Sequence, residues 1–113
     1  MARILLTAGP TRAFIDDVRY LTNASSGRMA VALAAAALAR GHEVTIVSGP
    51  VQVAYPRQAR VVPVTTTAEM LAAALAELPS CDGVIAAAAP CDFEPLVQAS
   101  GKIPRQGDGL TLK

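Results

Sequence analysis

Small polar and basic side chains gather between the first apolar run of the chain and its first alanine-rich stretch. Gly9-Pro10-Thr11-Arg12 follows the apolar run directly, and Ser25-Ser26-Gly27 comes just before the alanine-rich stretch. Backbone amides at the start of a helix bind phosphate or carboxylate groups, and an arginine can hold two oxygens of such a group. Arg19 and Asn23, four residues apart, could point into the same pocket. The pattern therefore predicts an anion-binding pocket with one amide side chain that orients the ligand.

Each of these residues also has a purely structural interpretation. Ser25 and Ser26 are ordinary N-cap residues for a helix that we expect from about Gly27 to Arg40. Arg12 and Arg19, taken singly, would be solvated surface charges. Their concentration in one loop after a strand favours function, because binding residues are disproportionately found on such loops.

The elements that must position this loop can be predicted from local patterns. Apolar and β-branched runs predict four strands, of which the third contains a proline and so lies near a sheet edge: Arg3–Thr7, Glu43–Ser48, Arg60–Val64 and Asp82–Ala88. Gly41 terminates the first helix after Arg40, and a capping box from Thr66 to Glu69 opens a second helix that runs to about Leu78. We expect that second helix to bury one apolar face, formed by Met70, Leu71, Ala74, Leu75 and Leu78.

This order of strands and helices predicts an α/β, Rossmann-like three-layer fold with a mostly parallel sheet, in one domain over residues 1–113. Ligands in such folds bind at the carboxyl ends of the strands. A last run, Leu110–Lys113, predicts a C-terminal flap or dimerisation strand, because an unpaired strand would leave an exposed edge in a monomer. We therefore expect a homodimer.

Composition and missing motifs exclude several classes of function. The net charge is +1 with dispersed basic residues, so neither nucleic acid nor a membrane surface is an expected partner. No signal segment is visible, and two cysteines without ligand-rich neighbours favour reduced thiols in a cytoplasmic protein with no metal site. The chain has neither a P-loop nor a G-x-G-x-x-G after its first strand, which argues against a dinucleotide dehydrogenase. The single histidine, His42, follows the first helix and suits a solvated turn better than a catalytic base.

Five segments resemble the phosphopantothenate–cysteine ligase (phosphopantothenoylcysteine synthetase) family. They are "TAGPTR" (7–12), "IDDVRYLTNASSGRM" (15–29), "VTIVSGPV" (44–51), "AAAPCDFEP" (87–95) and "GKIPRQGDGLTLK" (101–113), in the family's order. The resemblance implies an enzyme of coenzyme A biosynthesis. A nucleoside triphosphate, CTP in most bacteria and ATP in eukaryotes, activates the carboxylate of 4'-phosphopantothenate as an acyl nucleotide, and cysteine then displaces the nucleoside monophosphate.

The same resemblance assigns roles to individual positions. Asn23 would orient the reacting acyl group, and Lys102 would lie on a flap that closes over the nucleotide. The flap reads Lys102-Ile103-Pro104-Arg105, with proline at a usually basic position, so either Lys102 or Arg105 could act as its cation. Four residues would contact the phosphates through backbone amides and hydroxyls: Gly9, Ser25, Ser26 and Gly27. Arg19 would add positive charge there, and Ala88 and Asp92 would face the nucleotide's sugar and base. Asp92 also suits an Asx turn.

The resemblance further implies Mg²⁺ beside the triphosphate, a homodimer, and a flavin-dependent decarboxylase that is either fused or separate. The printed chain covers about the first half to two-thirds of the family domain, so we expect a domain that is incomplete at its C-terminus. Two other functions stay open. One is a non-catalytic nucleotide-binding or dimerisation module derived from the family, and the other, less favoured, is a fragment of an NAD(P)-binding oxidoreductase.

Overall fold

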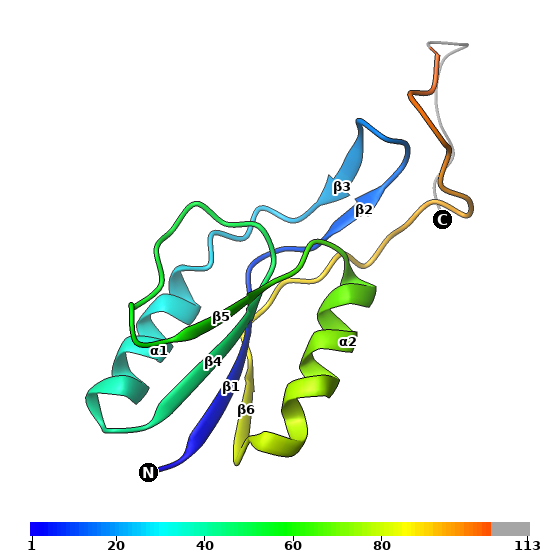
Figure 1. Ribbon diagram of the computed structural model, residues 1–113. Helices are drawn as coiled ribbons and strands as arrows, with labels where there is room; N and C mark the ends of the chain where they lie inside the picture. Colours follow the sequence, from blue (N-terminus) through cyan, green and yellow to red (C-terminus); the bar gives the residue numbers. More distant parts are fainter. Residues whose placement is uncertain (105–113) are drawn as a thin grey trace.

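The computed structural model describes residues 1–104, and its centre is a four-stranded sheet. The strand order is β5 (Arg60–Pro63), β4 (Glu43–Ser48), β1 (Arg3–Ala8) and β6 (Gly83–Ala86), and every neighbouring pair is parallel (Figure 1). The predicted parallel sheet and the edge position of the proline-containing strand are confirmed. β1 lies in the middle, so the chain reverses its direction of travel across the sheet when it passes from β5 to β6. Ligand sites of open α/β sheets lie at the carboxyl ends of strands around such a reversal.

One helix covers each face of the sheet. α1 (Arg28–Ala39) packs on the face where Leu6 lies, and α2 (Thr67–Glu77) packs on the face where Leu5 lies (Figure 1). Leu5 and Leu6 reach opposite helices because successive side chains of a strand point to opposite faces. This arrangement is the three-layer fold that the sequence predicts.

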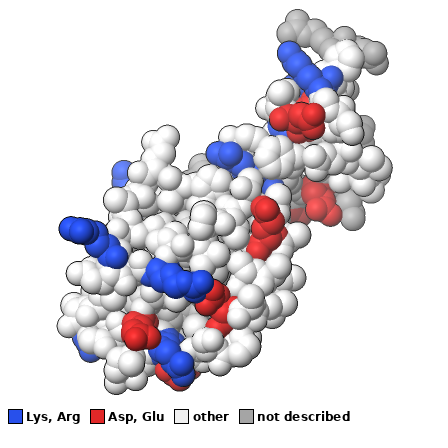
Figure 2. Space-filling view, in the orientation of Figure 1, with Lys and Arg blue, Asp and Glu red and all other residues white. Residues whose placement is uncertain are grey.

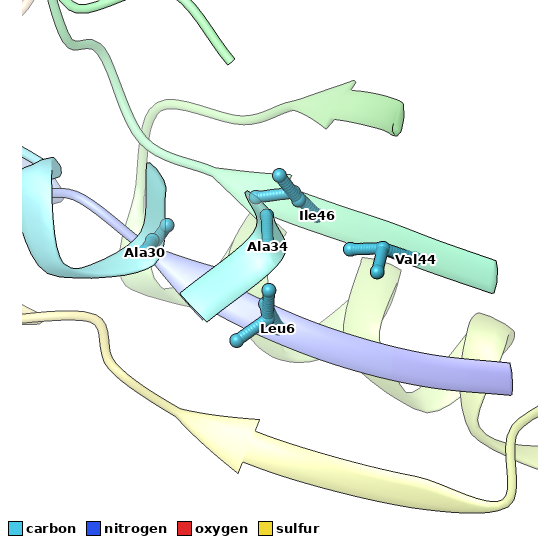
Figure 3. Packing of buried hydrophobic residues seen from close by; sticks show 6 residues of the cluster. Leu6, Ala30, Ala34, Val44 and Ile46 are labelled. Carbon is cyan, nitrogen blue, oxygen red and sulfur yellow. The ribbon is translucent and has the colours of Figure 1, made fainter. Parts of the chain in front are cut away.

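The core on the α1 side combines large strand residues with small helix residues. Ala30 and Ala34, one turn apart, lie against β1 and β4 (Figure 3). Alanine at these positions lets the helix approach the sheet closely, and the larger strand side chains fill the space between them. The buried residues of this layer are Leu6, Ala8, Ala30, Ala34, Val44 and Ile46.

The prediction of which residues form the buried face of α2 is partly wrong. The capping box is present, since the Thr66 hydroxyl accepts the Glu69 N–H at 3.1 Å and the Glu69 carboxylate accepts the Thr66 N–H at 2.8 Å. Met70 is buried, but Leu71, Leu75 and Leu78 are 60%, 57% and 45% exposed. The helix contacts the sheet through a narrower stripe that consists of Met70, Ala73 and Ala74. Periodicity alone cannot place the contact line when alanines and leucines alternate around the helix.

The segment between β1 and α1 (residues 9–27), which we call the crossing, contains a hairpin that is not among the strands predicted from the sequence. β2 (Arg12–Phe14) and β3 (Tyr20–Thr22) pair antiparallel in a sheet of their own, beyond the carboxyl end of β1 (Figure 1). The rings of Phe14 and Tyr20 meet edge to face at 5.5 Å, and the Arg12 guanidinium lies 4.3 Å from the centre of the Tyr20 ring. Strands of three residues show no alternation long enough to predict.

Several expected boundaries shift by one or two residues. β1 ends at Ala8, β5 ends at Pro63, and β6 runs from Gly83 to Ala86. An additional turn of 3₁₀ helix (Leu78–Ser80) follows α2. The strand expected at 110–113 lies outside the described residues.

Candidate functional site

The loops after β1, β4 and β6 meet at the carboxyl end of the sheet. A Cβ atom on Gly49 would lie 1.6 Å from the carbonyl oxygen of Pro10, so only glycine permits this approach of the two loops. The Ala89 N–H donates to the Gly9 carbonyl at 3.0 Å and brings in the loop after β6. Gly9 therefore contributes a carbonyl to the framework of the site, and its role toward a phosphate stays a prediction.

A first hollow, which we call the serine hollow, lies at the start of α1. It measures about 480 Å³ and is lined by Arg12, Ala24, Ser25, Ser26, Arg28, Pro50, Val51, Gln52 and Val53. Its lining among residues 1–104 includes two arginines and no acidic residue, so it suits an anion. The structure thus brings Ser25 and Ser26 together with Arg12, as the sequence predicts. Arg28 also lines the hollow and is not among the residues predicted from the sequence.

The expectation that Ser25 and Ser26 are the N-cap residues of α1 is wrong. The N-cap is Gly27, at φ +82° and without a side-chain cap, and the Ser26 hydroxyl accepts the N–H of Arg28 at 3.3 Å. A left-handed glycine turns the chain into the helix, and Ser26 binds only the first N–H of the first turn. Within residues 1–104, no side chain accepts the N–H groups of Met29 and Ala30, and such amides favour an anionic ligand.

Arg19 binds Asp16 and Ile103 and does not point into the predicted anion pocket. Its Nη1 donates to the carboxylate of Asp16 at 2.8 Å and to the carbonyl of Ile103 at 3.0 Å. Arg19 does not line the serine hollow, whose cations are Arg12 and Arg28. The contribution of Arg19 to phosphate binding remains a prediction, and in this structure its charge is balanced by Asp16.

Asn23 joins the crossing to the loop after β6. Its Nδ2 donates to the carbonyl oxygens of Ala89 at 2.9 Å and Pro90 at 3.0 Å. Among residues 1–104 its Oδ1 has no hydrogen-bond partner, so an acceptor remains for a ligand. The amide that the resemblance assigns to the acyl group therefore also holds the site's framework.

Asp92 lies in a second hollow of about 410 Å³, which we call the aspartate hollow. Its lining combines the hairpin, the start of α2 and the segment after β6: Arg12, Ala13, Phe14, Thr66, Thr67, Ala68, Cys91, Asp92, Phe93, Glu94, Pro95 and Gln98. Arg12 lines both hollows. Ala88, by contrast, packs with Leu5 and Met70 in the core on the α2 side. The predicted residues for sugar and base are thus separated from the serines, with Arg12 between them.

Thr11 is the framework residue that the sequence analysis missed. It is fully buried, and its hydroxyl accepts the Cys91 N–H at 2.7 Å and shares a hydrogen bond of 2.7 Å with the hydroxyl of Thr67. Its carbonyl accepts the Thr22 hydroxyl at 2.9 Å. One side chain therefore ties the crossing to α2 and to the loop after β6. The only signal in the sequence was its position directly after Gly9-Pro10.

Lys102 is exposed and lies between two anchored residues. The Gly101 N–H donates to Asp17 at 2.7 Å, and the Ile103 N–H donates to Asp16 at 2.8 Å. Arg105, the alternative flap cation, lies outside the described residues. Within residues 1–104, no three His, Cys, Asp or Glu side chains group closely enough to hold a metal ion.

Charges on the face in Figure 2 are dispersed, with basic and acidic residues interspersed. In the part of the chain that the structure describes, no helix has the length and apolar character needed to cross a membrane.

The sheet order, the helix on each face and the hollows at the strand ends define a Rossmann-like α/β domain whose serine hollow suits an anion. Residues 1–113 match the DNA/pantothenate metabolism flavoprotein C-terminal domain family, and the chain belongs to this family.

Relatives and solved structures agree with this assignment. The chain is 46% identical over 113 residues to the coenzyme A biosynthesis bifunctional protein CoaBC of Escherichia coli K12, covering 97% of the chain and 28% of that protein. It is 47% identical over 111 residues to a cysteine/cysteine sulfinic acid decarboxylase from an unknown prokaryotic organism, covering 97% and 31%. The crystal structure of the C-terminal domain of a CoaBC protein superposes with a TM-score of 0.80 at 44% identity, covering 85% of the chain and 48% of that domain. The chain thus spans less than a third of these curated relatives.

Proposed function

We propose that this chain is part of a phosphopantothenate–cysteine ligase, which activates 4'-phosphopantothenate with a nucleoside triphosphate and joins it to cysteine. The observation that carries the proposal is the serine hollow. The N–H groups of Met29 and Ala30 at the start of α1, which no side chain of residues 1–104 accepts, lie near Arg12 and Arg28, and none of the described lining residues is acidic. The E. coli relative named for coenzyme A biosynthesis supports the choice of reaction.

The chemistry requires several anions to meet. A carboxylate is a poor electrophile, and a nucleotidyl group attached to one of its oxygens provides a leaving group, which the cysteine amine then displaces. The phosphate groups would lie against Ser25, Ser26 and Gly27, where amides and the helix dipole stabilise negative charge. Asn23 would use its free Oδ1 toward the acyl group, and Lys102 would approach from the flap.

The nucleotide is CTP or ATP, and Mg²⁺ accompanies it in this proposal. The described residues that line the serine hollow include no carboxylate. They do not form a Mg²⁺ site by themselves, so the ion would be held mainly by phosphate oxygens and water, as is usual for Mg²⁺ with nucleotides.

The whole protein would act as a homodimer in the cytoplasm, with a flavin-dependent decarboxylase fused or separate. A second function has specific support, because one relative of 47% identity is named as a decarboxylase. In such a protein this domain would serve as a nucleotide-binding or dimerisation module that does not itself form the amide.

The two functions are distinguished by pyrophosphate release from CTP or ATP, measured with 4'-phosphopantothenate and with or without cysteine. A ligase releases pyrophosphate, and a module that only binds the nucleotide does not. Calorimetric titration then locates the nucleotide. Arg28→Ala should weaken nucleotide binding by about tenfold, the loss of one charge-assisted contact. Arg40→Ala, at the exposed other end of the same helix, should leave binding unchanged and serves as the control. Equal affinities of the two variants for the nucleotide would show that it does not bind in the serine hollow.

A further inference from the structure

Asp16 is a fully buried carboxylate with two separate sets of hydrogen bonds. Its Oδ1 accepts the N–H groups of Val18 at 2.9 Å and Arg19 at 2.8 Å, within the turn of the hairpin. Its Oδ2 accepts the Arg19 guanidinium at 2.8 Å and the Ile103 N–H at 2.8 Å. One oxygen therefore shapes the turn, and the other holds a segment 87 residues further along the chain.

The segment around Ile103 has further bonds to the same turn. The Arg19 guanidinium donates to the Ile103 carbonyl, so both polar groups of this residue's backbone are held. Two residues earlier, Gly101 exchanges a pair of hydrogen bonds with Asp17, through its carbonyl at 3.0 Å and its N–H at 2.7 Å. Lys102 lies between these two anchored residues, and its own side chain is exposed.

We propose that Asp16 is a positioning residue that fixes the flap backbone on the carboxyl side of Lys102 and so holds this lysine beside the hairpin. The consequence for catalysis rests on the proposed function, in which Lys102 approaches the nucleotide. Arg19 contributes to this anchor, because it balances the buried charge of Asp16 and binds the Ile103 carbonyl. A buried carboxylate is stable only with such partners.

The charge of Asp16 matters as well as its shape. Its pKa lies below the ordinary value because the Ile103 N–H, followed by those of Val18 and Arg19, stabilises the ionised form against the effect of burial. An asparagine at this position has one acceptor oxygen in place of two. It can keep the bonds to the turn or the bonds to Ile103 and Arg19, but not both.

A lysine-specific protease tests the anchor directly. The printed sequence has two lysines, Lys102 and Lys113, and the cleavage to follow is the one at the Lys102–Ile103 bond. The N–H of this bond is the one that Asp16 binds, and the segment must open before it is cut. Asp16→Asn should accelerate cleavage by at least about tenfold, the loss expected for a hydrogen bond to a charged group.

Asp82→Asn is the matched control, because Asp82 also accepts a backbone N–H and pairs with an arginine, at the opposite end of the sheet. Cleavage of this variant should stay at the wild-type rate. Equal cleavage of the Asp16 and Asp82 variants would overturn the proposal. If Asp16→Asn does not fold, hydrogen exchange in the wild-type chain decides, and fast exchange of the Ile103 and Gly101 amides would equally overturn it.

Kinetics test the link to catalysis. If Asp16 positions Lys102 for the nucleotide, Asp16→Asn should raise the KM for CTP or ATP by about tenfold and leave the KM for cysteine unchanged, because a smaller fraction of the flap is competent to bind. Faster cleavage with an unchanged nucleotide KM would overturn the positioning of Lys102. If neither the wild-type protein nor the variants have ligase activity, the proposed function is wrong. The protease result would still show whether Asp16 holds the backbone at Ile103.

Discussion

Asn23 and Ala89 are joined across the carboxyl end of the sheet by a hydrogen bond of 2.9 Å between the Asn23 Nδ2 and the Ala89 carbonyl. The same nitrogen donates to Pro90 at 3.0 Å. An asparagine to which the sequence assigns the orientation of a ligand therefore also connects two loops 66 positions apart. Any change at this position acts on the architecture of the site as well as on its chemistry.

Asn23→Asp should destabilise the fold by about 1–3 kcal/mol, because a carboxylate cannot donate and would face two carbonyl oxygens. From the sequence alone we would expect a stability change of only about 0.5 kcal/mol, as for a surface loop residue. Urea unfolding at pH 7 measures the difference. Gln52→Glu, the same amide-to-acid change at an exposed loop position, should cost no more than about 0.5 kcal/mol. Equal losses in the two variants would contradict the structural role of Asn23.

Thr11→Val removes a buried hydroxyl without changing the shape of the side chain. The Cys91 N–H and the Thr67 hydroxyl would lose their partner, so we expect a loss of about 1–3 kcal/mol in the free energy of unfolding. Thr45→Val is the control, because no hydrogen bond of the Thr45 hydroxyl is present in the described part of the chain and valine suits a strand. Thermal unfolding of both variants checks this, and an unchanged Tm for Thr11→Val would refute it.

Gly27→Ala and Gly41→Ala separate backbone strain from crowding at the serine hollow. Both glycines have left-handed backbones, at φ +82° and +84°, so each alanine should cost about 1–2 kcal/mol. A Cβ on Gly27 would also lie 3.0 Å from Val51, whereas one on Gly41 meets nothing within 4 Å. Gly27→Ala alone should weaken nucleotide binding, by about tenfold or more in titration. Equal binding by both variants would show that the entry to α1 does not contact the ligand.

Asp16 should make stability depend on pH in the acid range. Its folded pKa is lowered, chiefly by the Ile103 N–H, so the ionised form is favoured in the folded state. The stabilisation is fully present above the ordinary aspartate pKa of about 4 and is lost as pH falls through the lowered value. Urea midpoints should differ most between wild type and Asp16→Asn at pH 7 and converge toward pH 2. A constant difference at every pH would count against this role.

Local patterns were sufficient to predict much of the fold. Glu43–Ser48 forms the predicted strand with the predicted ends, because consecutive β-branched residues suit a strand buried on both faces. Thr66 and Glu69 form the predicted capping box, since both partners lie within one helical turn. Ser25, Ser26 and Arg12 from the motif of small and basic residues before α1 line one hollow, whereas Arg19 and Asn23 do not line it, and anion binding there stays a prediction.

The sequence by itself thus determined the order of strands and helices, the parallel sheet and the segment that lines the serine hollow. Only the tertiary structure decided that Asp16 and Arg19 bind the backbone of Ile103, that Asn23 binds the loop after β6, and that Asp92 lies in a separate hollow. The reason is the range of the interactions. Helix and strand patterns repeat every few residues, whereas these contacts join positions brought together by the crossovers of the sheet.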